Sequence, residues 1–256
     1  MRERREDSGE GVLQAGTVKS LVIITKSFAI TLWISIIVIY RLHRGLYTRR
    51  HCDSLLRWWS RKLLRYVGMN CRTFNLDEEV FRGGRPVIIM TNHSSLYDIP
   101  IMFVTLPGSI RMLTKKDLFK VPIWGKGLET GEFIPIHRDN RRRAIKDLAQ
   151  ARKKMESGII LWIAPEGTRS RTGDLGPFKK GGFMLALRSK AIIVPVGIRG
   201  AREVLPARSC TFSLGRQVEV HVGSPIDAAS RQAAGVETLM KEVESQLRSL
   251  MGTAAS

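Results

Sequence analysis

The chain has 256 residues, enough for one sizeable α/β domain with its own core. Its 43% hydrophobic and 25% charged residues exclude a disordered or collagen-like chain. The 42 Lys and Arg exceed the 23 Asp and Glu by 19 positive charges, which favours polyanionic partners, either nucleic acid or an anionic lipid surface.

The cysteines have neither the spacing of a CxxC motif nor an even count, being Cys52, Cys71 and Cys210. This excludes the usual patterns of a disulfide framework or a zinc site and favours a reducing compartment. We expect all three thiols to be buried as small hydrophobic side chains.

Residues 1–18 are polar and predict a flexible tail, and residues 21–40 are almost wholly apolar. At about 1.5 Å per residue, a helix over 21–40 just spans a bilayer core of about 30 Å, although Lys26 lies inside it. The basic residues at both ends, slightly more numerous after the helix, favour an inner (cytoplasmic) membrane with the C-terminal domain on the cytoplasmic side. A spanning helix and a helix that dips into one leaflet both remain open.

Residues 52–67 have a helical period and complete a membrane-anchoring segment over 19–70. Basic side chains lie off an apolar stripe that consists of Leu55, Leu56, Trp59, Leu63, Tyr66 and Val67. A basic amphipathic helix of this kind fits the membrane interface, with its stripe in the acyl boundary. The alternative is an ordinary helix that packs its stripe on the domain.

From residue 73 to 256, short apolar runs alternate with helical patterns. We expect buried strands at 86–91, 158–164, 191–198 and 217–222, and helices at 140–157, 181–189 and 236–251. Pro195 predicts an edge or strand-end position for its strand. The alternation predicts an α/β domain with a mixed, largely parallel sheet flanked by helices, preceded by the membrane-associating helical segment.

The stretch NHSSLYD at 92–98 follows the first of these strands directly. His93 and Asp98, five residues apart, would point away from each other on one helix, so they meet only if His93 lies on a loop and Asp98 on the next helix. Ser94 and Ser95 are good N-cap types for such a helix. The carboxylate would fix the imidazole tautomer and leave the other nitrogen to take a proton from a hydroxyl. A capping histidine beside a helix-start aspartate is the alternative.

A second polar cluster, PEGTRS at 165–170, also follows a strand. Backbone amides at Gly167, the hydroxyl of Thr168 and the guanidinium of Arg169 suit a phosphate. Glu166 would orient a cation or a substrate hydroxyl instead. Further candidate substrate-binding cations are Arg138, after the run FIPIH, together with Lys115 and Lys179.

The ordered set NHSSLYD, FIPIHR, PEGTRS and IVPV resembles the four sequence blocks of the glycerol-phosphate and lysophosphatidate acyltransferase family. The resemblance implies a general base at His93 oriented by Asp98, and a substrate-binding arginine at Arg138. It also implies an acceptor-phosphate site around Glu166, Gly167 and Arg169. Two departures stand out: His137 precedes the arginine of the second block, where an aspartate is common, and Ala164 precedes the proline of the third.

The resemblance further implies transfer of an acyl group from a thioester of acyl-carrier protein or coenzyme A to lysophosphatidate, without cofactor or metal. Another lysophospholipid, a lyso-aminolipid or glycerol-3-phosphate remain alternative acceptors. We expect anionic membrane lipids as partners and no nucleic acid, because the chain shows no nucleic-acid-reading motif and such binding leaves the 21–40 segment unexplained.

Overall fold

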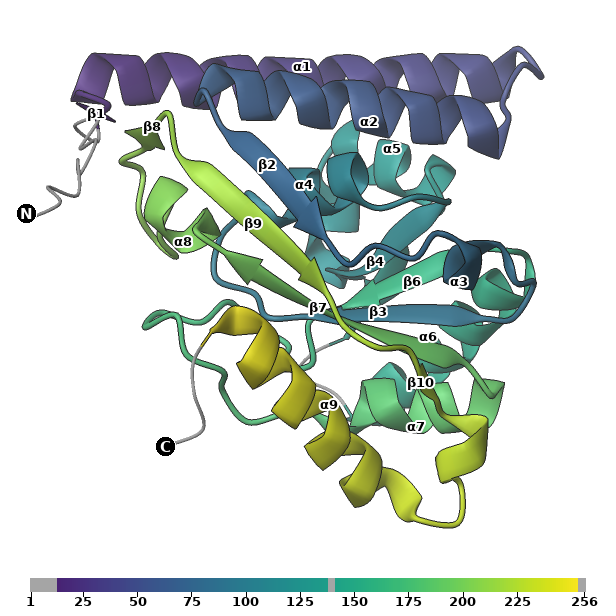
Figure 1. Ribbon diagram of the computed structural model, residues 1–256. Helices are drawn as coiled ribbons and strands as arrows, with labels where there is room; N and C mark the ends of the chain where they lie inside the picture. Colours follow the sequence, from purple (N-terminus) through teal and green to yellow (C-terminus); the bar gives the residue numbers. More distant parts are fainter. Residues whose placement is uncertain (1–12, 138–140, 253–256) are drawn as a thin grey trace, which may run out of the picture.

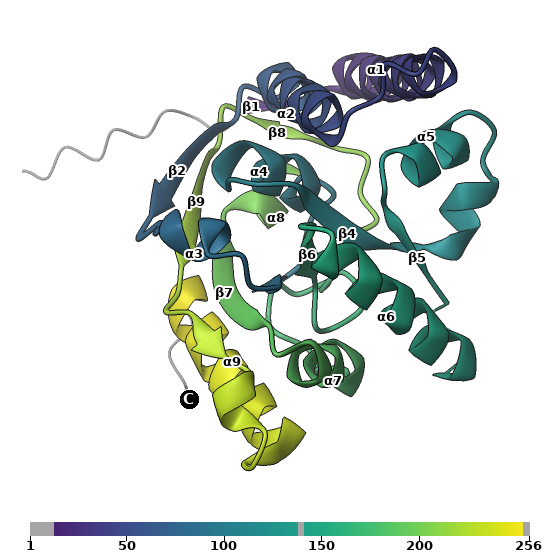
Figure 2. The ribbon, with the colours of Figure 1, turned by 90° about the vertical axis from the view of Figure 1, so that its right-hand side faces the viewer.

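The computed structural model describes residues 13–137 and 141–252 and has helices on both faces of a central sheet (Figures 1 and 2). The helices are α1 (Thr17–His43), α2 (Arg49–Tyr66), α3 (Glu79–Arg82), α4 (Asp98–Thr105), η1 (Lys116–Lys120), α5 (Trp124–Thr130), α6 (Arg141–Glu156), α7 (Lys180–Ser189), α8 (Ala201–Val204), η2 (Ala229–Arg231) and α9 (Gly235–Met251). The strands are β1 (Leu13–Gln14), β2 (Asn70–Phe74), β3 (Val87–Thr91), β4 (Ile110–Lys115), β5 (Ile134–Ile136), β6 (Ile160–Ile163), β7 (Ile192–Arg199), β8 (Ser213–Leu214), β9 (Gln217–Val222) and β10 (Ile226–Asp227).

The main sheet has the strand order β2-β9-β7-β3-β6-β4-β5, and β10 pairs beside β9 on β7. The strands from β7 to β5 run parallel, whereas β9 and β10 pair antiparallel with β7. The mixed, largely parallel sheet predicted from the sequence is confirmed, and the four predicted strands correspond to β3, β6, β7 and β9.

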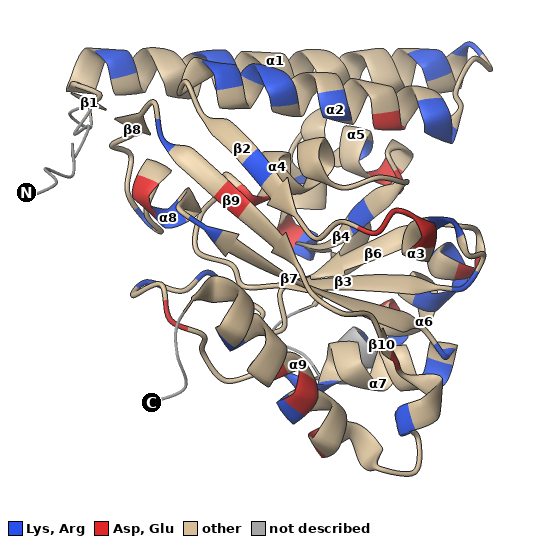
Figure 3. Ribbon diagram, in the orientation of Figure 1, with Lys and Arg blue, Asp and Glu red and all other residues tan. Residues whose placement is uncertain are grey.

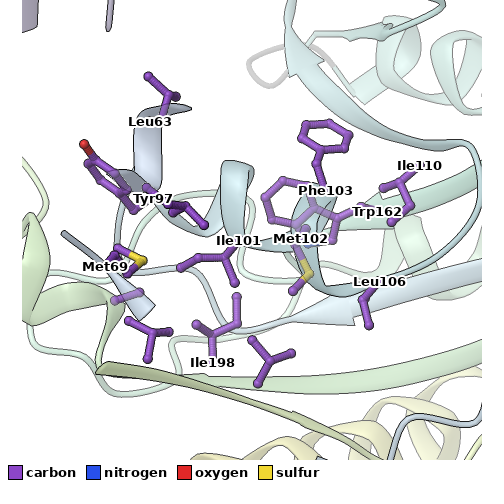
Figure 4. Close-up of a cluster of buried hydrophobic side chains, with 14 of the residues drawn as sticks. Leu63, Met69, Tyr97, Ile101, Met102, Phe103, Leu106, Ile110, Trp162 and Ile198 are labelled. Atoms are coloured by element: carbon purple, nitrogen blue, oxygen red, sulfur yellow. The ribbon is translucent and has the colours of Figure 1, made fainter. Parts of the chain in front are cut away.

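All five residues of β3 are buried, because helices cover both faces of the sheet. Val87 and Ile89 join the core beneath α1, α2 and α4, and Ile88 and Met90 join the core beneath α6, α7 and α9. Figure 4 shows part of the first core, in which α4 lies between the sheet and Leu63 of α2. The central strands therefore have a fixed register on both faces, which fixes where their ends lie.

The first two helices form a hairpin that lies across one side of the domain (Figure 1). Trp59 Nε1 donates to Thr31 Oγ1 at 3.0 Å and joins α2 to α1. The apolar stripe of α2 packs into the domain core, with Leu56 and Leu63 buried. The placement of this stripe in the acyl boundary was therefore wrong, because this face of α2 packs against α4 in the core.

The outer face of α1 is apolar and exposed, and α1 is long and apolar enough to cross a membrane. Lys and Arg recur along the hairpin, as Figure 3 shows. The junction to the sheet is short, because α2 ends at Tyr66 and β2 begins at Asn70. The hairpin and the sheet are thus directly continuous.

Pro195 lies inside β7, a central strand, so the prediction of an edge or strand-end position was wrong. On the side away from β3, β10 pairs with Ile192 and Ile193, and β9 pairs only from Val196 onward. The missing N–H of Pro195 therefore falls in a gap between two partner strands, where no ladder hydrogen bond is lost.

The N-terminal segment and the cysteines also differ from the predictions. Leu13 and Gln14 pair with β8 and α1 begins at Thr17, so the last residues of the predicted tail are ordered, while residues 1–12 lie outside the described part of the chain. The three cysteines are free thiols, but only Cys52 is buried; Cys71 is partly exposed, and Cys210 is exposed because it lies in the surface stretch 206–211.

Candidate active site

His93 and Asp98 form a hydrogen-bonded pair at the end of β3. His93 lies on the loop after Thr91, and Asp98 is the first residue of α4. The Nδ1 atom of His93 is 2.7 Å from Oδ2 of Asp98. The imidazole is 16% exposed and the carboxylate 1%, so the imidazole reaches the surface while the carboxylate is enclosed. This is the loop-to-helix geometry that the five-residue spacing predicts.

The loop between the two residues is held by the carboxylate itself. Oδ2 of Asp98 also accepts the backbone N–H groups of Ser94 at 2.8 Å and Ser95 at 2.9 Å. Ser94 and Ser95 were predicted as N-cap residues, and this prediction was wrong. The helix α4 begins only at Asp98 and has no side-chain cap. Ser95 Oγ instead donates to Leu205 O at 2.8 Å. One carboxylate oxygen therefore fixes both the loop and the tautomer of His93.

Neighbouring strands hold the pair from both sides. Asn92 is buried and exchanges two hydrogen bonds with the backbone of Ile198 in β7, at 2.9 and 2.8 Å. Trp162 of β6 lies edge-on to the imidazole with 6.0 Å between ring centroids, and its Nε1 donates to Thr91 Oγ1 at 2.9 Å. Sequence reasoning did not assign roles to Asn92 or Trp162, because both depend on which strands flank β3.

The loop after β6 lies against His93. The N–H of Ser170 donates to the carbonyl oxygen of His93 at 2.7 Å. Glu166 is only 6% exposed. Its Oε1 accepts the backbone N–H of His93 at 3.4 Å, and its Oε2 accepts the backbone N–H of Gly176 at 2.9 Å. Burial raises the pKa of Glu166 above its usual value, and the two N–H donors oppose that rise. Glu166 thus braces the two loops against each other.

A cationic rim lies beside this loop. Gly167 has a φ of 73°, and a Cβ added there would lie 3.0 Å from Lys179 Nζ, so the lysine side chain folds over the glycine. Only glycine allows both the backbone conformation and that close approach. Thr168 is exposed and Arg169 is partly exposed, one residue before the Ser170–His93 bond. The loop that bonds the backbone of His93 therefore carries a hydroxyl and two cations, whereas the N–H of Gly167 is donated to Ala164 O at 3.0 Å.

Of the remaining predicted site residues, Lys115 lies further along the same edge of the sheet. Lys115, the last residue of β4, is exposed and pairs with Asp117 Oδ2 at 3.0 Å. Arg138 lies outside the described residues. Among residues 13–137 and 141–252, no group of three His, Cys, Asp or Glu side chains could hold a metal ion.

Residues 73–199 match the family model described as Acyltransferase. The chain belongs to the acyltransferase family. The matched segment contains all four motifs, and it holds the His93–Asp98 pair together with the loop that carries Glu166, Gly167 and Arg169.

Curated relatives of this acyltransferase chain include three with related names. It is 29% identical over 160 residues to the chloroplastic 1-acyl-sn-glycerol-3-phosphate acyltransferase of Arabidopsis thaliana, covering 62% of this chain and 45% of that one. It is 29% identical over 196 residues to the human beta form, covering 76% and 69%. A putative 1-acyl-sn-glycerol-3-phosphate acyltransferase of Caenorhabditis elegans is 32% identical over 159 residues, covering 62% and 56%. The chain thus spans less than half of the Arabidopsis relative.

The acyltransferase fold also matches the crystal structure of the 1-acyl-sn-glycerophosphate acyltransferase from Thermotoga maritima. The TM-score is 0.73 at 21% sequence identity, and the match covers 93% of this chain and 99% of that chain. Since the match includes most of residues 13–252, the N-terminal helices belong to the shared fold as well as the sheet.

An apolar cavity opens beside the loop that carries His93. It has a volume of about 520 Å³, and its walls come from α1, α2, α4, η1 and α5. Leu96 and Tyr97, which separate His93 from Asp98 in sequence, also line it. Sequence reasoning could not find this cavity, because it forms only where the hairpin covers the domain.

Proposed function

We propose that this chain transfers a fatty acyl group from a thioester to the sn-2 hydroxyl of lysophosphatidate, giving phosphatidate. The observation that carries the proposal is the enclosed Asp98 carboxylate bonded to an outward-facing His93. The names of the relatives agree with this reaction. With Asp98 bonded to Nδ1, His93 Nε2 is the atom that takes the proton from the acceptor hydroxyl.

The reaction then proceeds without a covalent enzyme intermediate. The acceptor oxygen attacks the thioester carbonyl carbon as its proton moves to His93 Nε2. The tetrahedral intermediate collapses, the carbon–sulfur bond breaks, and the leaving thiolate takes the proton back from the imidazolium. Asp98 stabilises the imidazolium in between. The Lys179 ammonium, which lies over Gly167, stabilises the oxyanion.

The acceptor phosphate occupies the cationic rim beside the catalytic pair. Arg169 and Lys179 supply positive charge, and Thr168 supplies a hydroxyl donor. Neither cation has an ion-pair partner among the described residues. The resemblance adds Arg138 to this set. Lys115 is less suited, because Asp117 already neutralises it.

The cavity receives an acyl chain. Its volume lies within the range of about 300–1,000 Å³ common for ligand pockets, and its lining is almost wholly apolar. Leu96 and Tyr97 lie on both the catalytic loop and the cavity wall, so an acyl chain in the cavity has its carbonyl end close to His93.

The helical hairpin seats the enzyme in one leaflet of an anionic membrane. α1 presents large exposed apolar side chains outward, including Leu21 at 63% and Phe28 at 56% exposure. Trp33 of α1 and Trp58 of α2 pair at the surface, with 5.3 Å between ring centroids, and Lys62 lies over the Trp58 ring. Surface tryptophans and lysines of this kind belong at headgroup level. The contacts of α1 with α2 and α5 favour a helix lying along the membrane over a spanning one.

The proposal is tested by assaying the full chain in vesicles of phosphatidylcholine and phosphatidylglycerol. Wild type should acylate lysophosphatidate, and His93→Ala should reduce the rate of this reaction by a factor of at least about 100. An active His93→Ala variant contradicts the mechanism. A panel with glycerol-3-phosphate, lysophosphatidylethanolamine and a lyso-aminolipid identifies the acceptor, and parallel assays with acyl-coenzyme A and acyl-carrier protein identify the donor.

A further inference from the structure

A second histidine–carboxylate pair lies outside the catalytic loop. His137 directly follows β5, and its Nδ1 is 2.8 Å from Oδ2 of Asp147 in α6. The backbone N–H of His137 donates to the same oxygen, also at 2.8 Å. The imidazole is 19% exposed and the carboxylate 11%. One enclosed oxygen therefore holds both the ring and the backbone of His137.

This arrangement repeats that of His93 and Asp98. In both pairs a carboxylate on the helix after the strand binds Nδ1 and at least one backbone N–H. In both, Nε2 of the imidazole has no hydrogen-bond partner within the described parts of the chain. An imidazole fixed in this way presents Nε2 to whatever occupies the space beyond the strand ends.

The register of the sheet places the two histidines at the same level. Met90 of β3 lies opposite Ile163 of β6. One residue earlier in β6, Trp162 lies opposite Met112 of β4, so Ile163 and Leu113 are at the same level. Leu113 in turn lies opposite Ile134 of β5. Each of these four strands runs parallel to its neighbour, so they end at one common edge of the sheet.

Three residues beyond this level, the strands β3, β6, β4 and β5 lead to His93, Glu166, Lys116 and His137 in that spatial order. With about 4.8 Å between adjacent strands, the backbones of the two histidines are separated by about 14 Å along the edge. A glycerol phosphate bound with its hydroxyl at His93 points its phosphate along this row, and an imidazole reaches it from the far end. Lys116, exposed between them, adds positive charge to the row.

We propose that His137 binds the acceptor phosphate through Nε2, and that Asp147 is the positioning residue that holds it there. The inference rests on the proposed function. The phosphate of lysophosphatidate is a phosphomonoester that can carry two negative charges, so it favours the charged imidazolium, which Asp147 also stabilises. His137 then contributes to the choice of acceptor, not to the proton transfer.

The first test distinguishes the proposed phosphate contact of His137 Nε2 from the structural hydrogen bond of His137 Nδ1 with Asp147. His137→Ala removes both nitrogens, whereas His137→Asn retains a side-chain N–H that can donate to Asp147 but lacks Nε2. Both variants should raise the KM for lysophosphatidate about tenfold, the effect expected for one lost hydrogen bond to a charged group, with kcat and the donor KM nearly unchanged. If Asn restores the wild-type KM, the role of His137 is only structural and the proposal is wrong.

The second test addresses Asp147 and the phosphate. Asp147→Asn should raise the acceptor KM about threefold or more without a matching fall in kcat. For lysophosphatidylethanolamine, a phosphodiester, the His137 variants should change KM less than for lysophosphatidate. Equal changes for the two acceptors contradict a phosphate role.

The matched control is His221→Gln. His221 also bonds a carboxylate, Glu219 Oε2 at 2.8 Å, but it lies in β9, two strands from β3 on the side away from β5. This variant should keep the wild-type KM. Inactive wild-type protein overturns the proposed function and this inference together, whereas active wild type with unaltered KM in the His137 variants overturns this inference alone.

Discussion

Arg111 of β4 is fully buried and donates from Nη1 to Oδ1 of Asp53 in α2 at 2.7 Å. Its Nε donates to the carbonyl oxygen of Gly131, at the end of α5. The other carboxylate oxygen of Asp53 accepts Ser109 Oγ at 2.6 Å. A single buried guanidinium thus joins the helical hairpin to two walls of the apolar cavity.

Asp53→Asn should therefore destabilise the protein strongly. The substitution leaves the Arg111 charge buried without its counterion, which costs about 3–5 kcal/mol in the free energy of unfolding. Thermal unfolding in detergent measures the loss. Asp117→Asn, at an exposed ion pair, is the control and should change the melting temperature little.

Asp98→Asn should reduce kcat about 100-fold or more while leaving the protein folded. Asparagine can place its one oxygen where Oδ2 accepts the three N–H donors, but it carries no negative charge and cannot stabilise an imidazolium. Steady-state kinetics with both substrates measure the effect. A kcat within a factor of about three of wild type would exclude Asp98 from catalysis.

Leu128→Trp should shorten the acyl chain that the enzyme prefers, because Leu128 lines the cavity and the larger side chain fills part of it. Competition between acyl donors of different length measures the preference. Lys126→Gln, two residues earlier and exposed, should leave it unchanged. An unchanged preference in Leu128→Trp would place the acyl chain elsewhere.

The ion pair between Arg49 and Glu132 should make stability fall in acid. Arg49 Nε donates to Glu132 Oε2 at 2.6 Å, and this bond lowers the pKa of Glu132 from 4.5 to about 2. The pKa of Glu132 is thus lower in the folded protein than in the unfolded chain. The contribution of the ion pair to the free energy of unfolding is therefore complete above pH 4.5 and is lost as the pH falls towards 2.

The melting temperature of Arg49→Gln should consequently decline less steeply over that pH range than the melting temperature of wild type. Arg82→Gln, which removes an exposed ion pair with Glu78, serves as the control and should follow wild type. Identical slopes for wild type and Arg49→Gln would assign the acid sensitivity to other carboxylates.

Local patterns were enough to predict the central strands and the bonded geometry of His93 and Asp98. The four predicted strands are short apolar runs buried on both faces, and the His93–Asp98 spacing permits one loop geometry. The stripe of α2 was harder to interpret, because the residue pattern of an apolar helix face is the same whether that face contacts lipid or packs on the domain. Pro195 was misplaced because the gap between β9 and β10 depends on pairing across the sheet.

Contacts between distant segments could not be derived from the sequence. Glu166 bonds Gly176 across a loop whose path no periodic pattern encodes. The bond between His137 and Asp147 depends on how α6 returns along β5. The cavity depends on α1 and α5 meeting, where Gly127 leaves no room for a Cβ beside Ser35. Each of these features arises from tertiary packing, which local residue types do not specify.

The short junction between α2 and β2 has a mechanical consequence. Only Val67, Gly68 and Met69 separate a helix of the hairpin from a strand of the sheet, and Gly215 N–H donates to the carbonyl oxygen of Val67 at 2.9 Å within that junction. The hairpin and the sheet therefore have no hinge between them. In the proposed membrane seating, bending or thinning of the leaflet that tilts the hairpin would turn the whole domain by the same angle, and access to His93 would become sensitive to the shape of the bilayer.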